Sequence, residues 1–362
     1  IMKKSIFLNF AYGYGPFLRA LDIAAEFNKI LISKGYEPFN IVSPLVYGSR
    51  QIQIAKESHP ELEIKFDVDT GAVLNKIFYK GKNYSENLKL ISENYFKVEK
   101  EFNVVVEKLI SEENVVMEIS RNPRILSPIP LSYSSVMGLF SEFLQKSVNK
   151  GMFSGNHVDK CIKIAKRIEN SQTKIFVSEP KSLGIEELCV SVPFIGTDVE
   201  VDQSSIEEGV YFYKSGINEL DYLNIDFGKF KVYDSDKDPV KIKFNKNIIG
   251  IVARAGWGTI SNSVILNKPL IVFPYSEGDD PEIFFNVEVL KDLDIAAIYD
   301  SALSFSENLD IAISKLPNMC SFKNQILIKY GMLNGSRYCA EVMFFDMHNV
   351  DRFLRFSDKE VL

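Results

Sequence analysis

The sequence predicts an α/β protein with two domains. Its 362 residues exceed the roughly 250–300 at which a single hydrophobic core stops growing. Short apolar runs of strand length alternate with longer periodic stretches of helix length, as in βα units around a parallel sheet. Each half begins with a strand that runs into a glycine-bearing turn. The best candidate linker follows Gly196, where residues 198–208 include five acidic side chains.

The elements follow in order along the chain. The predicted strands are short apolar runs: Ser5–Phe10, Phe39–Ser43, Val115–Ile119, Lys174–Ser178, Gly209–Tyr213, Ile248–Ala253 and Pro269–Phe273. The predicted long helices have apolar residues near one face: Phe17–Lys34, Asn87–Ile110 and Lys323–Phe345. We therefore expect a first domain over 1–196, a second over 197–322, and a helical segment over 323–362 that could pack back on the first domain.

Composition excludes several classes of partner. The net charge is −6, with 42 basic and 48 acidic residues mixed along the chain, so no extended positive face is available for nucleic acid. The four cysteines are widely spaced, which favours free thiols in the reducing cytoplasm over disulfide bridges or a zinc site. No run approaches the roughly 20 apolar residues of a membrane span, so we expect at most peripheral membrane contact.

The most informative stretch follows the strand Ile248–Ala253. Gly256 and Gly258 lie at its turn into a helix, where glycine lets the backbone approach a ligand closely. The free N–H groups at the start of that helix attract a phosphate or a diphosphate. Thr259 adds a hydroxyl and Arg254 a permanent positive charge. A simple tight turn capped by glycine is the alternative interpretation.

Arg254–Asn286 resembles the donor-binding region of GT-B type glycosyltransferases, which transfer sugars from nucleotide sugars. The resemblance is to the UDP-glycosyltransferases and to the enzymes that add N-acetylglucosamine to the peptidoglycan lipid precursor. The glycine-rich turn is followed by an apolar strand that ends in Pro274, and then by Asp280, Glu282 and Asn286 in the family's order. The resemblance implies two Rossmann-like domains that face each other across a cleft.

It also implies roles for individual residues. The turn and the helix start would hold the diphosphate, and Asp280 and Glu282 would bind sugar hydroxyls, with Glu282 standing where the family usually has Gln. Asn262 stands where the family has a ribose-binding Glu, and it keeps hydrogen-bonding capacity without the charge. The donor-binding residues expected on this basis are Arg254, Gly256, Trp257, Gly258, Thr259, Asn262, Asp280, Glu282 and Gly216.

The first glycine loop resembles the acceptor side of the same families. Gly13, Tyr14 and Gly15 form this loop, and Arg19 fits the family pattern in the helix that follows. The family's histidine, which activates the acceptor hydroxyl, aligns with Pro16. Proline is favoured in the first turn of a helix, so the position also has a purely structural explanation.

A catalytic base must therefore come from elsewhere. Glu118 follows the strand residues Val115–Met117 and is expected at the carboxyl edge of the sheet, where burial could adapt a carboxylate to proton transfer. An ion-paired or solvated loop acid is the alternative. His157 is the second candidate, and a helix-cap role is its alternative.

The resulting hypothesis is transfer of a sugar from a nucleoside diphosphate sugar to an acceptor hydroxyl, without a metal or other cofactor. The acceptor could be a small molecule, a glycan or a lipid-linked molecule. Lysines alternate with aromatic residues over Lys76–Lys100, which fits either an anionic membrane surface or a solvated helix face. A non-catalytic nucleotide-sugar-binding relative and a nucleotide-sugar epimerase or hydrolase remain the alternative functions.

Overall fold

A computed structural model describes most of the chain. The described residues are 3–10, 14–76, 83–121, 125–135, 141–181, 189–196, 198–214, 225–235 and 237–357. They divide into two compact units. Unit 1 comprises Ile1–Ser178, Gly184–Thr197 and Asn334–Leu362, and unit 2 comprises Glu179–Leu183 and Asp198–Leu333.

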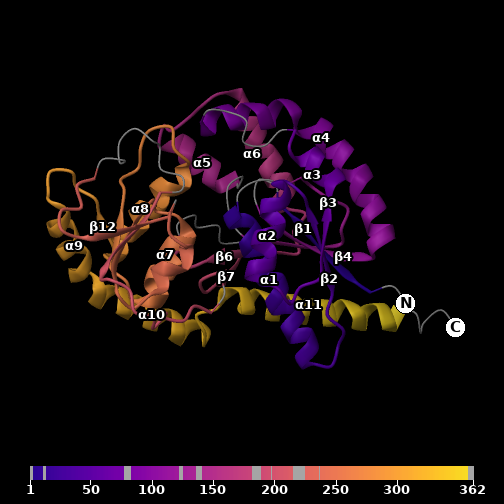
Figure 1. Ribbon diagram of the computed structural model, residues 1–362. Coiled ribbons are helices and arrows are strands. Elements are labelled where there is room, and N and C mark those ends of the chain that lie inside the picture. The colour runs from indigo at the N-terminus through magenta and orange to yellow at the C-terminus, as the bar shows by residue number, and fades with distance from the viewer. Residues whose placement is uncertain are drawn as a thin grey trace. The chain divides into compact units, whose positions relative to one another are not determined.

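Unit 1 is built on a seven-stranded sheet in which all neighbouring strands are parallel (Figure 1). The strand order is β3-β2-β1-β4-β5-β6-β7. The strands are β1 (Ser5–Asn9), β2 (Asn40–Pro44), β3 (Ile64–Asp67), β4 (Val115–Arg121), β5 (Leu131–Ser135), β6 (Lys174–Ser178) and β7 (Cys189–Val192). The helices are α1 (Tyr14–Ser33), α2 (Gly48–Ser58), α3 (Val68–Leu74), α4 (Tyr84–Glu113), α5 (Ser141–Asn149), α6 (Asn156–Glu169) and α11 (Gly335–Ser357).

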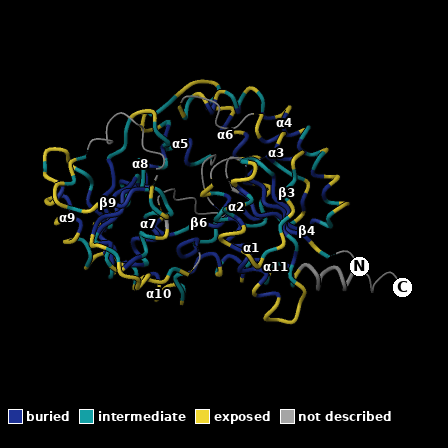
Figure 2. Tube along the Cα trace, in the orientation of Figure 1, coloured by how far each residue is buried: buried dark blue, intermediate teal, exposed yellow. Residues whose placement is uncertain are grey.

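The core of unit 1 joins the sheet to α1 and α11, which pack against each other. Ile6 and Leu8 of β1 lie in one buried cluster with Leu21 of α1 and Met343 of α11. Figure 2 shows the central strands of this sheet as buried, whereas the edge strand β3 has no buried residue. Helix α11 can start where it does because Gly335 has no side chain: a Cβ there would lie 2.5 Å from the carbonyl oxygen of Pro193. That approach also allows the Gly335 N–H to donate to Phe194 O over 2.7 Å.

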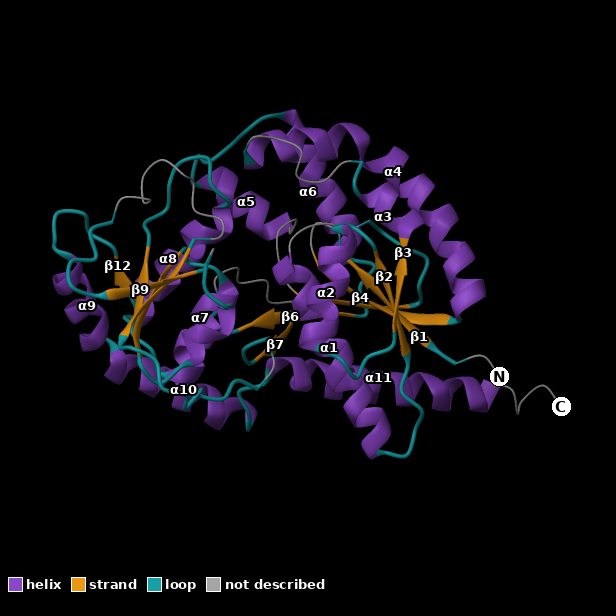
Figure 3. Cartoon of the chain, viewed as in Figure 1, coloured by secondary structure: helices purple, strands orange, loops and turns teal. Residues whose placement is uncertain are grey.

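Unit 2 is built on a five-stranded parallel sheet of order β12-β11-β10-β8-β9. Helices flank this sheet (Figure 3). Its strands are β8 (Gly209–Tyr213), β9 (Lys231–Asp234), β10 (Ile248–Ala253), β11 (Leu270–Val272) and β12 (Ala297–Ile298). Its helices are η1 (Val240–Phe244), α7 (Trp257–Leu266), α8 (Pro281–Leu293), α9 (Phe305–Ser314) and α10 (Leu316–Tyr330).

The predicted α/β architecture is confirmed, and one predicted helix is wrong. The sequence predicted a single helix over Lys323–Phe345, but α10 ends at Tyr330 and α11 begins at Gly335. The break occurs at Gly331, which adopts a left-handed conformation with φ of 71° and caps α10. The predicted segment 323–362 is thereby divided, because α10 belongs to unit 2 and α11 to unit 1.

A charged cluster in unit 1 ties α1 to the chain near Gly196. Asp22 lies 3.3 Å from the guanidinium of Arg19 and 2.8 Å from Nε2 of His59, and Nδ1 of His59 lies 3.2 Å from Glu61. Arg19 also donates to the carbonyl of Ile195 over 2.9 Å. Burial lowers the pKa of His59, but the hydrogen bonds and charges of Asp22 and Glu61 more than offset it, and the net pKa is raised above 6.5.

This cluster makes stability depend on pH. Because folded His59 holds its proton more tightly than unfolded His59, its contribution to the unfolding free energy is fully present below pH 6.5. The contribution is lost as pH rises through the raised pKa. We expect urea unfolding from about pH 5.5 to 8.5 to show a stability decline that is shallower in His59→Gln. Identical slopes in the two proteins would contradict the prediction.

Candidate functional site

Two residues of the predicted acceptor-side loop, Tyr14 and Gly15, lie in α1, which begins at Tyr14, three residues earlier than predicted. Pro16 lies in the first turn of the helix, where its missing N–H costs nothing. Tyr14 is 36% exposed, and its ring lies 4.6 Å from that of Tyr47. A Cβ at Gly15 would meet no atom within 4 Å. Gly13 lies outside the described residues.

The predicted position of Glu118 is wrong. Strand β4 continues to Arg121, so Glu118 lies within the strand and is fully buried. Its carboxylate accepts hydrogen bonds from Ser132 Oγ at 2.6 Å, Ser127 Oγ at 2.7 Å and Asn9 Nδ2 at 3.1 Å. Asn9 also donates to Ile125 O over 2.9 Å. The carboxylate thus connects the ends of β1 and β5 with the segment after β4, and these contacts favour a structural role.

His157 lies in the first turn of α6, next to Gly155 with its φ of 115°. Its Nε2 is buried and has no hydrogen-bond partner among the described residues. A Cβ at Gly155 would lie 3.2 Å from the imidazole ring, so the missing side chain of this glycine leaves space for the ring. No contact joins His157 to Glu118 among the interactions that the structure describes. Their assignment as a catalytic base stays a prediction.

In unit 2 the predicted glycine turn lies between β10 and α7, at the carboxyl edge of the sheet. Gly256 is the N-cap of α7 and supplies no side-chain acceptor. Its carbonyl accepts from Thr259 N and Ile260 N, and within the described residues the N–H groups of Trp257 and Gly258 have no acceptor. A Cβ at Gly256 or Gly258 would meet no atom within 4 Å. The first amides of α7 are therefore left without an acceptor in the described part of the chain, and the space beside the two glycines is open, which is compatible with an anion site.

The second predicted segment lies beside this turn. Asn286 of α8 is buried and donates to Ala255 O over 2.8 Å. Asp280 is the N-cap of α8, accepts from Glu282 N over 3.0 Å and precedes Pro281 at the first helical position. The structure therefore brings the glycine turn and the start of α8 together within unit 2.

Arg254 forms an ion pair with Asp279. Its Nη2 lies 2.6 Å from Asp279 Oδ1, and its Nε lies 3.2 Å from Asp279 Oδ2, which makes a two-point ion pair. Sequence reasoning missed Asp279, because nothing in its local pattern distinguishes it from the neighbouring Asp280. Asn262 lies on α7 and is 8% exposed. Gly216 lies outside the described residues.

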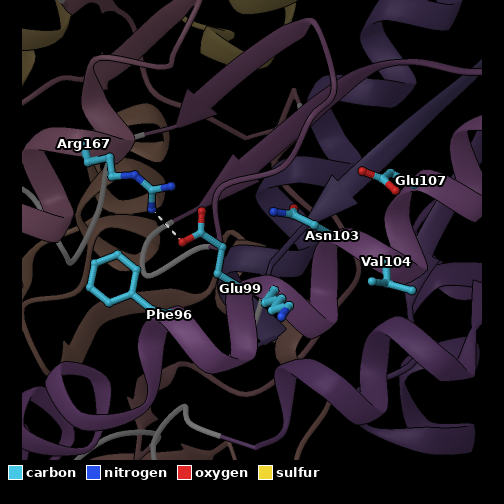
Figure 4. A pocket seen from close by; sticks show the side chains of 7 residues that line it. Phe96, Glu99, Asn103, Val104, Glu107 and Arg167 are labelled. Atoms are coloured by element: carbon cyan, nitrogen blue, oxygen red, sulfur yellow. Dashed lines mark hydrogen bonds and ion pairs between the residues drawn. The ribbon is translucent and has the colours of Figure 1, made fainter.

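The structure describes only part of the Lys76–Lys100 surface, because residues 77–82 lie outside the described residues. Among its described aromatic residues, Tyr95 is buried, Tyr84 stacks on Phe153 and Phe96 is exposed. Phe96 borders an open groove of about 380 Å³ along α4, where Arg167 of α6 reaches Glu99 over 2.6 Å (Figure 4). Lys76 pairs with Glu101. In the described part of the chain, no helix is both long and apolar enough to span a membrane.

The two parallel sheets with their helices define the class of fold. It is the GT-B fold of two Rossmann-like domains, which confirms the fold expected from the sequence. Residues 243–325, which include the β10–α7 turn and α8, match the glycosyltransferase family 28 C-terminal domain. No curated protein sequence matches the chain.

Solved structures match over nearly the whole chain at low identity. The glycosyltransferase of kitacinnamycin has a TM-score of 0.58 at 10% identity, covering 95% of this chain and 99% of its own. A Polygonum tinctorium UDP-glucosyltransferase capable of glucosylating indoxyl has a TM-score of 0.56 at 11% identity, covering 94% and 97%. The spinosyn rhamnosyltransferase SpnG, complexed with thymidine diphosphate, has a TM-score of 0.56 at 9% identity, covering 94% and 100%.

The contacts of Glu118 lead to a stability prediction. Glu118→Ala removes the acceptor of three hydrogen bonds inside unit 1, and we expect it to lower the unfolding free energy by about 3 kcal/mol. Glu112→Ala is the matched control, because it removes an exposed carboxylate and should change stability by less than about 0.5 kcal/mol. Chemical denaturation measures both. Equal effects would show that the buried cluster contributes nothing specific.

Proposed function

We propose that the protein is a glycosyltransferase that binds a nucleoside diphosphate sugar in unit 2 and transfers the sugar to an acceptor hydroxyl. The observation that carries the proposal is the β10–α7 turn. There, the first N–H groups of α7 have no acceptor within the described residues and the space beside Gly256 and Gly258 is open, in a segment that matches a glycosyltransferase domain. Two of the similar structures support a nucleotide-sugar donor: one is named a UDP-glucosyltransferase and another is complexed with thymidine diphosphate.

The chemistry follows from where charge develops. When the sugar leaves, negative charge accumulates on the diphosphate, and amides already aimed at that position stabilise it without reorganising. The α7 macrodipole adds to this effect, because its positive end lies at Trp257. Asn262 lies about one turn further along α7, within reach of a ribose hydroxyl if the diphosphate sits on the turn. Asp280 and Glu282, at the start of α8, are the proposed contacts for the sugar.

Binding at the turn can be tested without an acceptor. Gly256→Val places a branched side chain beside the glycine turn, where an added Cβ would meet no atom of the described residues within 4 Å. We expect calorimetry with UDP and dTDP to show at least about tenfold weaker binding of whichever nucleotide the unmutated protein prefers. Ser314→Val, at the exposed end of α9, is the control for added bulk. Unchanged affinity in Gly256→Val would refute the site.

Transfer itself needs a separate test. If Glu118 or His157 is the general base, its loss should reduce turnover by roughly 10²–10⁴-fold while donor affinity stays nearly constant. Glu118→Gln and His157→Ala should therefore be assayed for sugar transfer and for nucleotide binding separately. Full transfer by both variants would exclude both residues as the base. An unmutated protein that binds donor but transfers nothing to a broad acceptor panel would favour a non-catalytic nucleotide-sugar-binding protein.

A further inference from the structure

The Arg254–Asp279 pair connects the two segments of the proposed donor site. Arg254 follows β10 and Asp279 precedes α8, so the pair joins two loops 25 residues apart in sequence. The side chains are only 25% and 19% exposed. A two-point arginine–carboxylate contact fixes orientation as well as distance, because the guanidinium is planar and both of its bonds must form together.

The pair continues into a chain of hydrogen bonds that ends in α8. Oδ1 of Asp279, which receives Arg254, also accepts from Asp280 N over 2.7 Å. Asp280 in turn caps α8 by accepting from Glu282 N. The Asn286–Ala255 bond joins the same two segments a second time. The position of the α8 start relative to the glycine turn is therefore set by two independent links.

The same geometry makes Arg254 a poor direct ligand for a phosphate. Its charge is already balanced by a carboxylate on two of its nitrogens, and a diphosphate could recruit it only by displacing Asp279. That exchange would leave a mostly buried carboxylate beside a highly charged anion, which is unfavourable. The amides of Trp257 and Gly258 need no such exchange.

We propose that Arg254 and Asp279 are positioning residues that set the spacing between the diphosphate and the sugar in the donor site. The inference rests on the proposed function. In the proposed donor site, the start of α7 holds the diphosphate. The Arg254–Asp279 pair then holds Asp280 and Glu282 where their side chains can contact a hexose attached to that diphosphate. Arg254 thus acts through Asp279 and not on the phosphates, which revises the role expected from the sequence.

A double-mutant cycle of Arg254→Ala, Asp279→Ala and the double variant distinguishes the two roles of Arg254. The probes are UDP, dTDP, UDP-glucose and dTDP-glucose, measured by calorimetry. We expect each single variant to weaken the preferred sugar nucleotide by about tenfold, and the double variant to be no weaker than either. The bare nucleotide should change by less than about threefold. The inference is overturned if Arg254→Ala weakens the bare nucleotide while Asp279→Ala leaves it unchanged or tightens it.

Hydrogen exchange on the ligand-free protein gives a second readout that needs no nucleotide. The amides of residues 279–286 should lose protection in both single variants and keep it in Lys291→Ala, which removes an exposed ion pair from the same helix. Unchanged protection in the single variants would overturn the positioning role. If the unmutated protein binds none of the four probes, the proposed function fails, and the exchange result still decides whether the pair positions α8.

Discussion

All strand pairings in both sheets are parallel, and this constraint arranges the rest of the molecule. A parallel pair cannot be closed by a tight hairpin, so the chain must cross back over the sheet before the next strand. The ends of neighbouring strands therefore meet at one edge. In unit 2 this brings the loop after β10 beside the loop after β11, which is why Arg254 reaches Asp279 and Asn286 reaches Ala255.

Charged side chains inside the two units are held by several short hydrogen bonds. The carboxylate of Glu118 accepts from two hydroxyls and an amide, and the ammonium of Lys268 donates to the carbonyls of Asn245, Lys246 and Ile248. Burial lowers the pKa of Lys268 because it disfavours the charged form. A buried charge with such partners stiffens the loops it touches. In this chain, burial of an ionisable group is thus not by itself a sign of catalysis.

The sequence predicted the parts of the fold that local patterns specify. Strand β10 has the predicted bounds because five apolar residues and Gly250 form a continuous run that ends at the glycine-bearing turn. Strand β5 was missed because its sequence, Leu131–Ser135, contains three serines, a residue type that is mostly exposed in proteins, whereas all three are buried here. The break at Gly331 was missed because amphipathic periodicity continues across it. For Arg254 the sequence shows a charge but not its partner, since Asp279 meets it only once both loops are folded.

The division of the chain into units has a consequence for biosynthesis. Cys339, Met343 and Met347 of α11 are buried against the α1 side of the first sheet, yet they follow all of unit 2 in the chain. A ribosome releases residues in order, so this apolar surface stays uncovered while residues 198–333 are being made. Unit 2 can complete its own core first. A fragment that ends after residue 197 would keep an exposed apolar face, whereas one that spans residues 198–333 would lack Glu179–Leu183 of unit 2 but contain its whole buried apolar cluster.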